Sequence, residues 1–145
     1  MGDPTIQFDA GRKARATLWA PPIFWAALIA TATSLPGRTL PGSPFPHFDL
    51  LVHVGMYGGL AFLFYRAMLL GTALGRNGWL WLIVLALVQG YGILDEIHQL
   101  WIPNRSCDAF DALADGLGAA IGIGVYFVCF VRVRNVPPDR EPAEP

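Results

Sequence analysis

The stretch YGILDEIHQLWIPNRSCDAFDALADGLG, residues 91–118, joins two apolar segments and is the part of the chain richest in ionisable side chains. Between Asp95 and Asp115 it holds five carboxylates, one histidine and one arginine. The chain as a whole is 54% hydrophobic and only 14% charged, whereas a typical soluble domain has about 25% charged residues. This composition indicates a membrane protein, and it makes a dense group of acids in the middle of an apolar region a candidate functional site.

Working outward from this stretch, the sequence divides into four apolar segments. They cover residues 17–35, 50–71, 78–101 and 108–131. Each approaches or exceeds the roughly 20 residues that a helix needs to cross the hydrocarbon core. We therefore predict an all-α polytopic membrane protein, a bundle of four transmembrane helices. Pro21 and Pro22 are expected near the start of the first helix, where a missing N–H donor costs little.

The placement of lysine and arginine predicts the orientation, because cytoplasmic loops carry an excess of these residues. With four spans, eight of the ten basic residues fall on the side of the termini, and only Arg38 and Arg105 fall on the other. Both termini are therefore expected in the cytoplasm. The predicted organisation is a cytoplasmic segment over residues 1–16, a four-helix domain over 17–131 and a disordered cytoplasmic tail over 132–145. With a net charge of −1 the chain has no basic excess that would suggest nucleic-acid binding.

The second span begins with three polar residues at a spacing of four. Asp49, His53 and Tyr57 therefore lie along one face of the predicted helix. Asp49 can also act as an N-cap or as a first-turn carboxylate. For His53, which lies deeper among apolar neighbours, the alternative to a site role is a structural hydrogen bond to another helix.

The third span ends with Asp95, Glu96, His98 and Gln99. At about 100° per residue, Glu96 and His98 point roughly 160° apart, so only one of them faces the bundle interior. We expect the side that carries Asp95, Glu96 and Gln99 to face inward and His98 to lie near the interface. A carboxylate at this depth is costly in lipid unless it faces a partner, an ion or water. The structural alternative is a polar pair that only holds helices together.

The fourth span carries a stripe at 3-4-3-4 spacing, formed by Asp108, Asp111, Asp115, Gly118 and Gly122. Its deeper part, Gly118-x-x-x-Gly122, allows another helix to approach closely. The N-cap of this helix can be either Ser106 or Asp108, so Asp108 can have a purely structural role instead.

The connection between these two spans is predicted to be a tight turn at Pro103 and Asn104. Arg105 is then expected over the ends of both acidic helices, where it either neutralises the acids or recognises a phosphate or carboxylate. The acids cannot all be charged, dry and close together. Either some stay protonated, or Arg105 and the histidines compensate them, or a divalent metal ion does. The candidate metal ligands are Asp49, His53, Asp95, Glu96, His98, Asp111 and Asp115.

The order FDLLVH…Y, YGILDEIHQ, PNRS and DALADGLGAAIG resembles the VanZ-like family of small bacterial membrane proteins, over about residues 30–125. The resemblance implies a multi-pass protein of the bacterial inner membrane, and the family's name derives from low-level resistance to the glycopeptide teicoplanin. Leu50 stands where the family usually has a lysine, so no role that rests on that lysine transfers. His98 fills a variable position of the motif. The residues carried over are Asp49, His53, Asp95, Glu96, Gln99, Arg105, Asp111 and Asp115.

Three functions fit these observations. The first is a hydrolase or transferase that acts on a lipid or lipid-linked envelope substrate with an anionic group, at a site facing the periplasm. Its predicted catalytic residues are Asp95, Glu96, His53 and Asp111. Its predicted substrate-binding residues are Arg105, Gln99, Tyr57, Asp49 and Asp115.

The second function is a non-catalytic binding or protective protein linked to teicoplanin-type resistance. The third is a small proton-coupled transporter, because ionisable residues within a span often mark such a pathway. Since the cytoplasmic half offers only Arg66 and no matching acids, a transporter of this kind requires a homo-oligomer.

Overall fold

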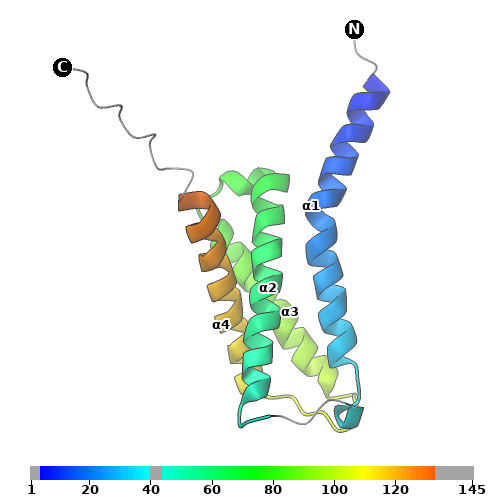
Figure 1. Ribbon diagram of the computed structural model, residues 1–145, viewed down its shortest axis with the longest axis vertical. Helices are drawn as coiled ribbons and strands as arrows, with labels where there is room; N and C mark the ends of the chain where they lie inside the picture. Colours follow the sequence, from blue (N-terminus) through cyan, green and yellow to red (C-terminus); the bar gives the residue numbers. More distant parts are fainter. Residues whose placement is uncertain (1–3, 40–43, 133–145) are drawn as a thin grey trace, which may run out of the picture.

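In the computed structural model of the chain, which describes residues 4–39 and 44–132, the fold is a bundle of four helices, with no strand in these ranges (Figure 1). The helices are α1 (Pro4–Thr33), α2 (Phe48–Gly71), α3 (Leu80–Gln99) and α4 (Ala109–Tyr126). Short 3-10 turns lie at Gly37–Thr39 and Ala73–Arg76, and a π-helical segment, Phe127–Arg132, continues α4. The all-α prediction is confirmed. From residue 133 on, the expected tail lies outside the described residues.

Each helix contains a segment long and apolar enough to cross a membrane. These segments are Arg15–Thr33, Phe48–Gly71, Leu80–Gln99 and Ala109–Phe130. In α4 the large side chains of Leu113, Leu117 and Ile121 are exposed on the outside, whereas the inward face is made of small and polar residues such as Asp115 and Gly118. This distribution suits a helix whose outer face contacts lipid. In a membrane, helices associate through close packing of small residues and polar contacts rather than through a hydrophobic core. The four predicted spans are confirmed.

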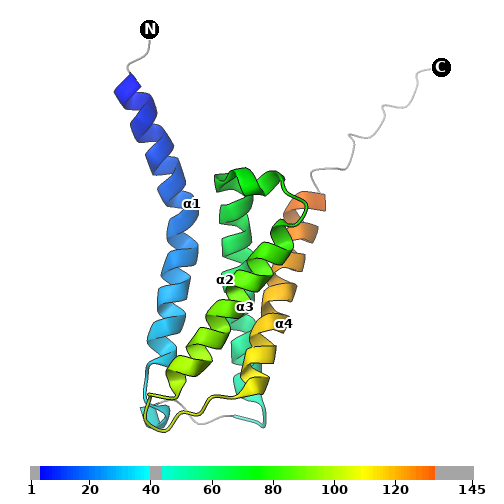
Figure 2. The ribbon, with the colours of Figure 1, turned by 180° about the vertical axis from the view of Figure 1, so that it is seen from behind.

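The other three helices are packed around α2. Figures 1 and 2 show α4 alongside α2, and α3 crosses them, behind α2 in Figure 1 and in front of it in Figure 2; the N-terminal part of α1 diverges from the bundle. The first turn of α1 and the end of α4 lie at the same end of the bundle. The α1–α2 and α3–α4 connections lie together at the opposite end, close to the candidate site.

The first helix differs from the expectation at its start. Pro21 and Pro22 were expected near the start of the first helix. Instead they lie inside it, because α1 begins at Pro4 and continues through both residues. Prolines inside a helix are tolerated in membranes better than in water, since neighbouring groups satisfy the carbonyls that they leave free.

Two hydrogen bonds attach α1 to the rest of the bundle. The indole Nε1 of Trp25 donates to the Met56 carbonyl of α2 at 2.8 Å, and the hydroxyl of Tyr91 on α3 donates to the Ala26 carbonyl at 2.8 Å. Interhelical bonds of this kind contribute about 0.6–2 kcal/mol each within a membrane. They fix the position of α1 at the level of the candidate site, where its last turn reaches α3.

The contact between α2 and α4 is made by glycine. Gly118 lies against the backbone of Val54, and Gly122 lies against the backbone of Gly58. A Cβ atom at either position would collide with the carbonyl oxygen of the facing helix. The expected close approach at the Gly118-x-x-x-Gly122 motif is therefore confirmed, and it brings the face of α2 that carries His53 against the face of α4 that carries Asp115.

We predict that Gly122→Ala destabilises the bundle by about 1–3 kcal/mol, the usual cost of overpacking a filled interior. The added methyl group must push the backbone of Gly58 away, and a backbone cannot rotate aside. Thermal unfolding of the purified protein in detergent measures the effect. The matched control is Gly124→Ala, on the same helix, where an added Cβ meets no atom. Equal melting temperatures for the two variants would contradict this account of the contact.

The two connections at the site end of the bundle are bonded to each other. The backbone N–H of Arg105 donates to the Ile102 carbonyl at 3.2 Å, and Asn104 has a φ of 60°. Proline followed by a residue of positive φ is the pattern of a type II turn, so the predicted turn at Pro103 and Asn104 is confirmed. The N–H of Gly37, between α1 and α2, donates to the Pro103 carbonyl at 3.1 Å.

Candidate functional site

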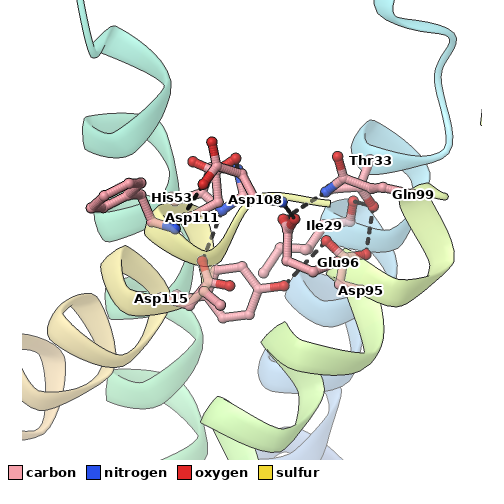
Figure 3. A network of polar contacts seen from close by, with 12 residues as sticks. Ile29, Thr33, His53, Asp95, Glu96, Gln99, Asp108, Asp111 and Asp115 are labelled. Atoms are coloured by element: carbon pink, nitrogen blue, oxygen red, sulfur yellow. Dashed lines mark hydrogen bonds and ion pairs between the residues drawn. The ribbon is translucent and has the colours of Figure 1, made fainter. Parts of the chain in front are cut away.

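The polar residues of three spans meet at the end of the bundle where the connections lie (Figure 3). On α3, Asp95, Glu96 and Gln99 are buried, whereas His98 is exposed. The predicted choice of the inward side of this helix is confirmed. From the other helices, His53 and Tyr57 of α2 and Asp115 of α4 are also buried.

His53 is held between two carboxylates of α4. Its Nδ1 lies 2.8 Å from Oδ1 of Asp115, which is 0% exposed, and its Nε2 lies 3.8 Å from Oδ2 of Asp111. An ionised carboxylate only accepts hydrogen bonds, so beside an ionised Asp115 the proton of the ring is on Nδ1, which donates to Oδ1. In the neutral ring Nε2 is then an acceptor that faces Asp111.

The Glu96 carboxylate is 2% exposed and bridges α3 to the start of α4. Its Oε1 accepts from Gln99 Nε2 at 3.0 Å, and its Oε2 accepts from the backbone N–H of Asp108 at 2.8 Å. These bonds hold the Glu96 carboxylate beside the side chains of His53 and Asp111. One ligand-type atom from each of His53, Glu96 and Asp111 lies within 4.8 Å of the other two. We call these three residues the His53 cluster.

Asp95 belongs to a different group of contacts. Its Oδ1 accepts from the Thr33 hydroxyl of α1 at 2.7 Å, and its Oδ2 accepts from the Tyr57 hydroxyl at 3.3 Å. Figure 3 shows Asp95, Thr33 and Gln99 on one side of the view and His53, Asp111 and Asp115 on the other, with Glu96 between them. Asp95 therefore joins three helices, which fits the structural alternative for this residue better than the role of a base.

Arg105 does not lie where it was expected. Its Nε is 3.4 Å from the Leu35 carbonyl, and its Nη2 is 3.4 Å from the Ala32 carbonyl. Among the described residues, no carboxylate lies within ion-pair distance of this guanidinium. The expectation that Arg105 lies over the acids is wrong, because its turn packs against the α1–α2 connection. There the carbonyls in the last turn of α1 and just beyond it, which carry partial negative charge, attract the guanidinium.

The outer acids are more exposed than the cluster. Asp49 lies in the first turn of α2 and is exposed, and the N-cap position belongs to His47, so the first-turn alternative holds and the N-cap alternative is wrong. Of the two residues predicted as possible N-caps of α4, it is Asp108 that holds the position, and its side chain accepts from the Phe110 N–H at 2.8 Å. The structure thus brings His53, Glu96, Asp111 and Asp115 together, with Asp49 exposed near Asp111, and it leaves His98 and Arg105 outside this group.

Two buried oxygens in this group have no hydrogen-bond partner among the described residues. They are Oδ1 of Asp111 and Oδ2 of Asp115. The group combines three carboxylates with one histidine, and no lysine or arginine within the described ranges pairs with them. An arrangement of this kind is expensive in a membrane unless some other positive charge or proton donor enters it.

The sequence analysis missed two residues that shape the site. Thr33 binds Asp95 across 62 positions of chain, and no local pattern pointed to this pairing. Gly92, in the middle of α3, lies so close to Asp115 that an added Cβ would be 2.5 Å from its Oδ2. A glycine inside an apolar helix was the available signal for a close contact.

An apolar cavity of about 370 Å³ lies between α1, α2 and α3, within the membrane-spanning part of the bundle. It is lined by Trp19, Pro22, Ile23, Ala26, Leu60, Phe64, Leu87, Val88 and Tyr91. Tyr91 is the lining residue that leads toward the site, because its ring centroid is 6.0 Å from that of Tyr57, which hydrogen-bonds Asp95.

Comparison with known proteins places the chain in a family. No curated protein and no solved structure matches it. The sequence model of the VanZ/LLP1 family matches residues 17–131, most of the chain and all four membrane-spanning segments apart from the first two residues of the first. The chain therefore belongs to the VanZ/LLP1 family, as the sequence resemblance implied.

Proposed function

We propose that this protein is a hydrolase or transferase that acts on a lipid or lipid-linked envelope substrate with an anionic group. The observation that carries the proposal is the His53 cluster, in which one imidazole and two carboxylates from three helices converge inside a membrane-spanning bundle. A structural role accounts poorly for this convergence. Ionisable side chains inside membrane-spanning segments are rare, and they mark substrate, ion or proton sites more often than simple packing contacts.

Helix packing at this end of the bundle has other sources. The glycine contacts hold α2 to α4, and Asp95 with Thr33 and Tyr57 joins the remaining helices. Apolar residues in place of His53, Glu96 and Asp111 would stabilise the bundle at least as well. The cluster is therefore better explained by chemistry than by stability.

The cluster suits attack on a phosphate or glycosyl centre. An imidazole nitrogen and two carboxylates either move a proton or hold a cation, and both activate an attacking oxygen. In hydrolysis of a phosphoester, the oxygen of water bonds to phosphorus as the ester P–O bond breaks. One proton of the water is taken up by the site, and a proton is returned to the leaving oxygen. In transfer, a hydroxyl of the acceptor replaces the water.

A lipid substrate is favoured by the apolar cavity between α1, α2 and α3. An acyl chain in this cavity would meet apolar side chains over its length and would end near Tyr91. From there the ring contact with Tyr57 leads to Asp95, whose neighbour in the sequence, Glu96, belongs to the cluster. A lipid held in this way would direct its headgroup toward the end of the bundle that carries the cluster.

The orientation of the site follows from the basic residues. The excess of lysine and arginine lies on the side of the termini, which supports cytoplasmic termini in the bacterial inner membrane. The cluster is at the opposite end of the bundle and so faces the periplasm. Substrates of the outer leaflet are then within reach, which agrees with the envelope-directed resistance that gave the family its name.

The test is a lipid conversion assay. Purified protein is incubated with total bacterial lipid extract, with and without added divalent cations, and lipids consumed or formed are identified by mass spectrometry. We expect conversion with the wild type and with His98→Gln, an exposed control on the same helix, and its loss with Glu96→Gln. A lipid that co-purifies equally with both forms and is never converted would instead establish the non-catalytic binding protein.

A further inference from the structure

We infer that the His53 cluster binds a divalent transition-metal cation, of the Zn²⁺ or Mn²⁺ type, through Nε2 of His53 and one carboxylate oxygen each of Glu96 and Asp111. The inference deepens the proposed function, because it names the group that receives the anionic part of the lipid. With the cation in place, these three side chains act as ligands, and the proton transfers pass through bound water.

The distances fit ligands around an ion better than they fit direct bonds between the ligands. Nε2 of His53 is 3.8 Å from Oδ2 of Asp111, which is too far for a hydrogen bond. Around a cation with bonds of about 2.1 Å, neighbouring ligand atoms lie roughly 3–3.4 Å apart. The three ligand atoms are all within 4.8 Å of one another, so small side-chain rotations complete the site.

Asp115 prepares His53 for this role. Its bond to Nδ1 fixes the proton on that nitrogen and aims the lone pair of Nε2 at Asp111. A carboxylate behind a histidine is the usual second partner of a metal-binding imidazole, and it also makes the nitrogen a stronger ligand. Asp115 is 0% exposed and has no other protein partner among the described residues, so this bond is its main interaction.

A second observation also points to a ligand. Oδ1 of Asp111 is buried without a hydrogen-bond partner among the described residues, although it belongs to the same carboxylate that faces His53. A buried carboxylate oxygen without a partner costs more than any neutral polar atom. A bound cation compensates this oxygen and the net negative charge of the three acids around His53 at the same time.

The ligand types select the class of ion. Mg²⁺ and Ca²⁺ prefer oxygen ligands only, whereas an imidazole together with carboxylates suits Zn²⁺ and its neighbours among the transition metals. Three protein ligands leave coordination positions open, as in catalytic rather than structural sites. Arg105 is bonded to carbonyls at the end of α1, whereas a cation held by the cluster supplies a positive charge for a phosphate of the substrate directly at the site.

The experiment measures metal binding without any lipid. Protein with its affinity tag removed and with Cys107→Ser and Cys129→Ser, which eliminates two exposed thiols, is stripped with a chelator. It is then titrated by calorimetry with Zn²⁺, Mn²⁺, Mg²⁺ and Ca²⁺. We expect one Zn²⁺ or Mn²⁺ per chain, and at least about a hundredfold weaker binding after Asp111→Asn or His53→Gln.

The controls keep the two proposals separate. His98→Gln removes an exposed imidazole from the same end of the bundle and is expected to bind as the wild type does. Equal binding by wild type and Asp111→Asn, when both melt at similar temperatures, overturns the inference, and so does binding of Mg²⁺ or Ca²⁺ alone. Lipid conversion that persists in the chelator-stripped protein overturns the metal site and leaves the proposed function standing. Specific Zn²⁺ or Mn²⁺ binding without any lipid conversion overturns the proposed function and leaves the metal site standing.

Discussion

Asp115→Asn is expected to slow lipid conversion by about 10²–10⁴-fold while the bundle stays folded. The side chain keeps its size inside a fully buried position, but it no longer offers Nδ1 of His53 a charged acceptor at 2.8 Å. The amide also presents two N–H donors, which favour the wrong tautomer of the ring. An Asp-to-Asn change behind a catalytic histidine costs about 10⁴ in a serine protease for this reason.

The same variant has a second readout. If His53 is a metal ligand, loss of the carboxylate behind it weakens metal binding by about 10–100-fold. Conversion is measured by mass spectrometry and binding by calorimetry, on samples whose melting temperatures are compared. Asp95→Asn provides the contrast. It alters the contacts with Thr33 and Tyr57. Compared with Asp115→Asn, it should therefore lower the melting temperature more and the rate of lipid conversion less. If Asp95→Asn lost more activity than Asp115→Asn, the division of the site into two groups would be wrong.

That division marks the limit of what the sequence could predict. Helical periodicity was enough to place Asp95, Glu96 and Gln99 on the inside and His98 on the outside, because the direction of a side chain on a helix depends only on its position. The same reasoning identified Gly118-x-x-x-Gly122 as a helix contact. The lengths of the apolar segments were enough to predict four spans.

The partners of these side chains could not be predicted in the same way. Periodicity says which residues share a face, but not which face of another helix lies opposite. Asp95 therefore looked like a member of the acidic site, whereas it bonds to Thr33, 62 positions away. Arg105 looked like the counter-charge of its nearest acids in the sequence, whereas its partners are carbonyls of Ala32 and Leu35. The partners of Asp95 and of Arg105 both lie in α1 or just after it. The sequence of this moderately apolar segment does not indicate which face of the bundle α1 packs against.

Gly92→Ala is expected to reduce lipid conversion by about a hundredfold, although no charged group is changed. A Cβ at this position would lie 2.5 Å from Oδ2 of Asp115 and 3.1 Å from its Cβ and Cγ atoms. The carboxylate must then turn or retreat inside a fully buried position, which is expected to disturb its 2.8 Å contact with Nδ1 of His53. A misplacement of about 1 Å in a catalytic group is enough for a loss of this size.

Helix propensity cannot account for such a loss, because alanine stabilises a helix relative to glycine by about 1 kcal/mol. Gly90→Ala gains the same propensity two residues earlier on α3, at a place where an added Cβ meets no atom, and is expected to convert lipid as the wild type does. The comparison therefore isolates the contact between Gly92 and Asp115. Wild-type conversion by Gly92→Ala would mean that Asp115 can move without consequence, and that His53 is oriented by something other than this carboxylate. A loss confined to Gly92→Ala, with His53 and every acid still in place, would show that the spacing of α3 and α4 sets the chemistry of the cluster.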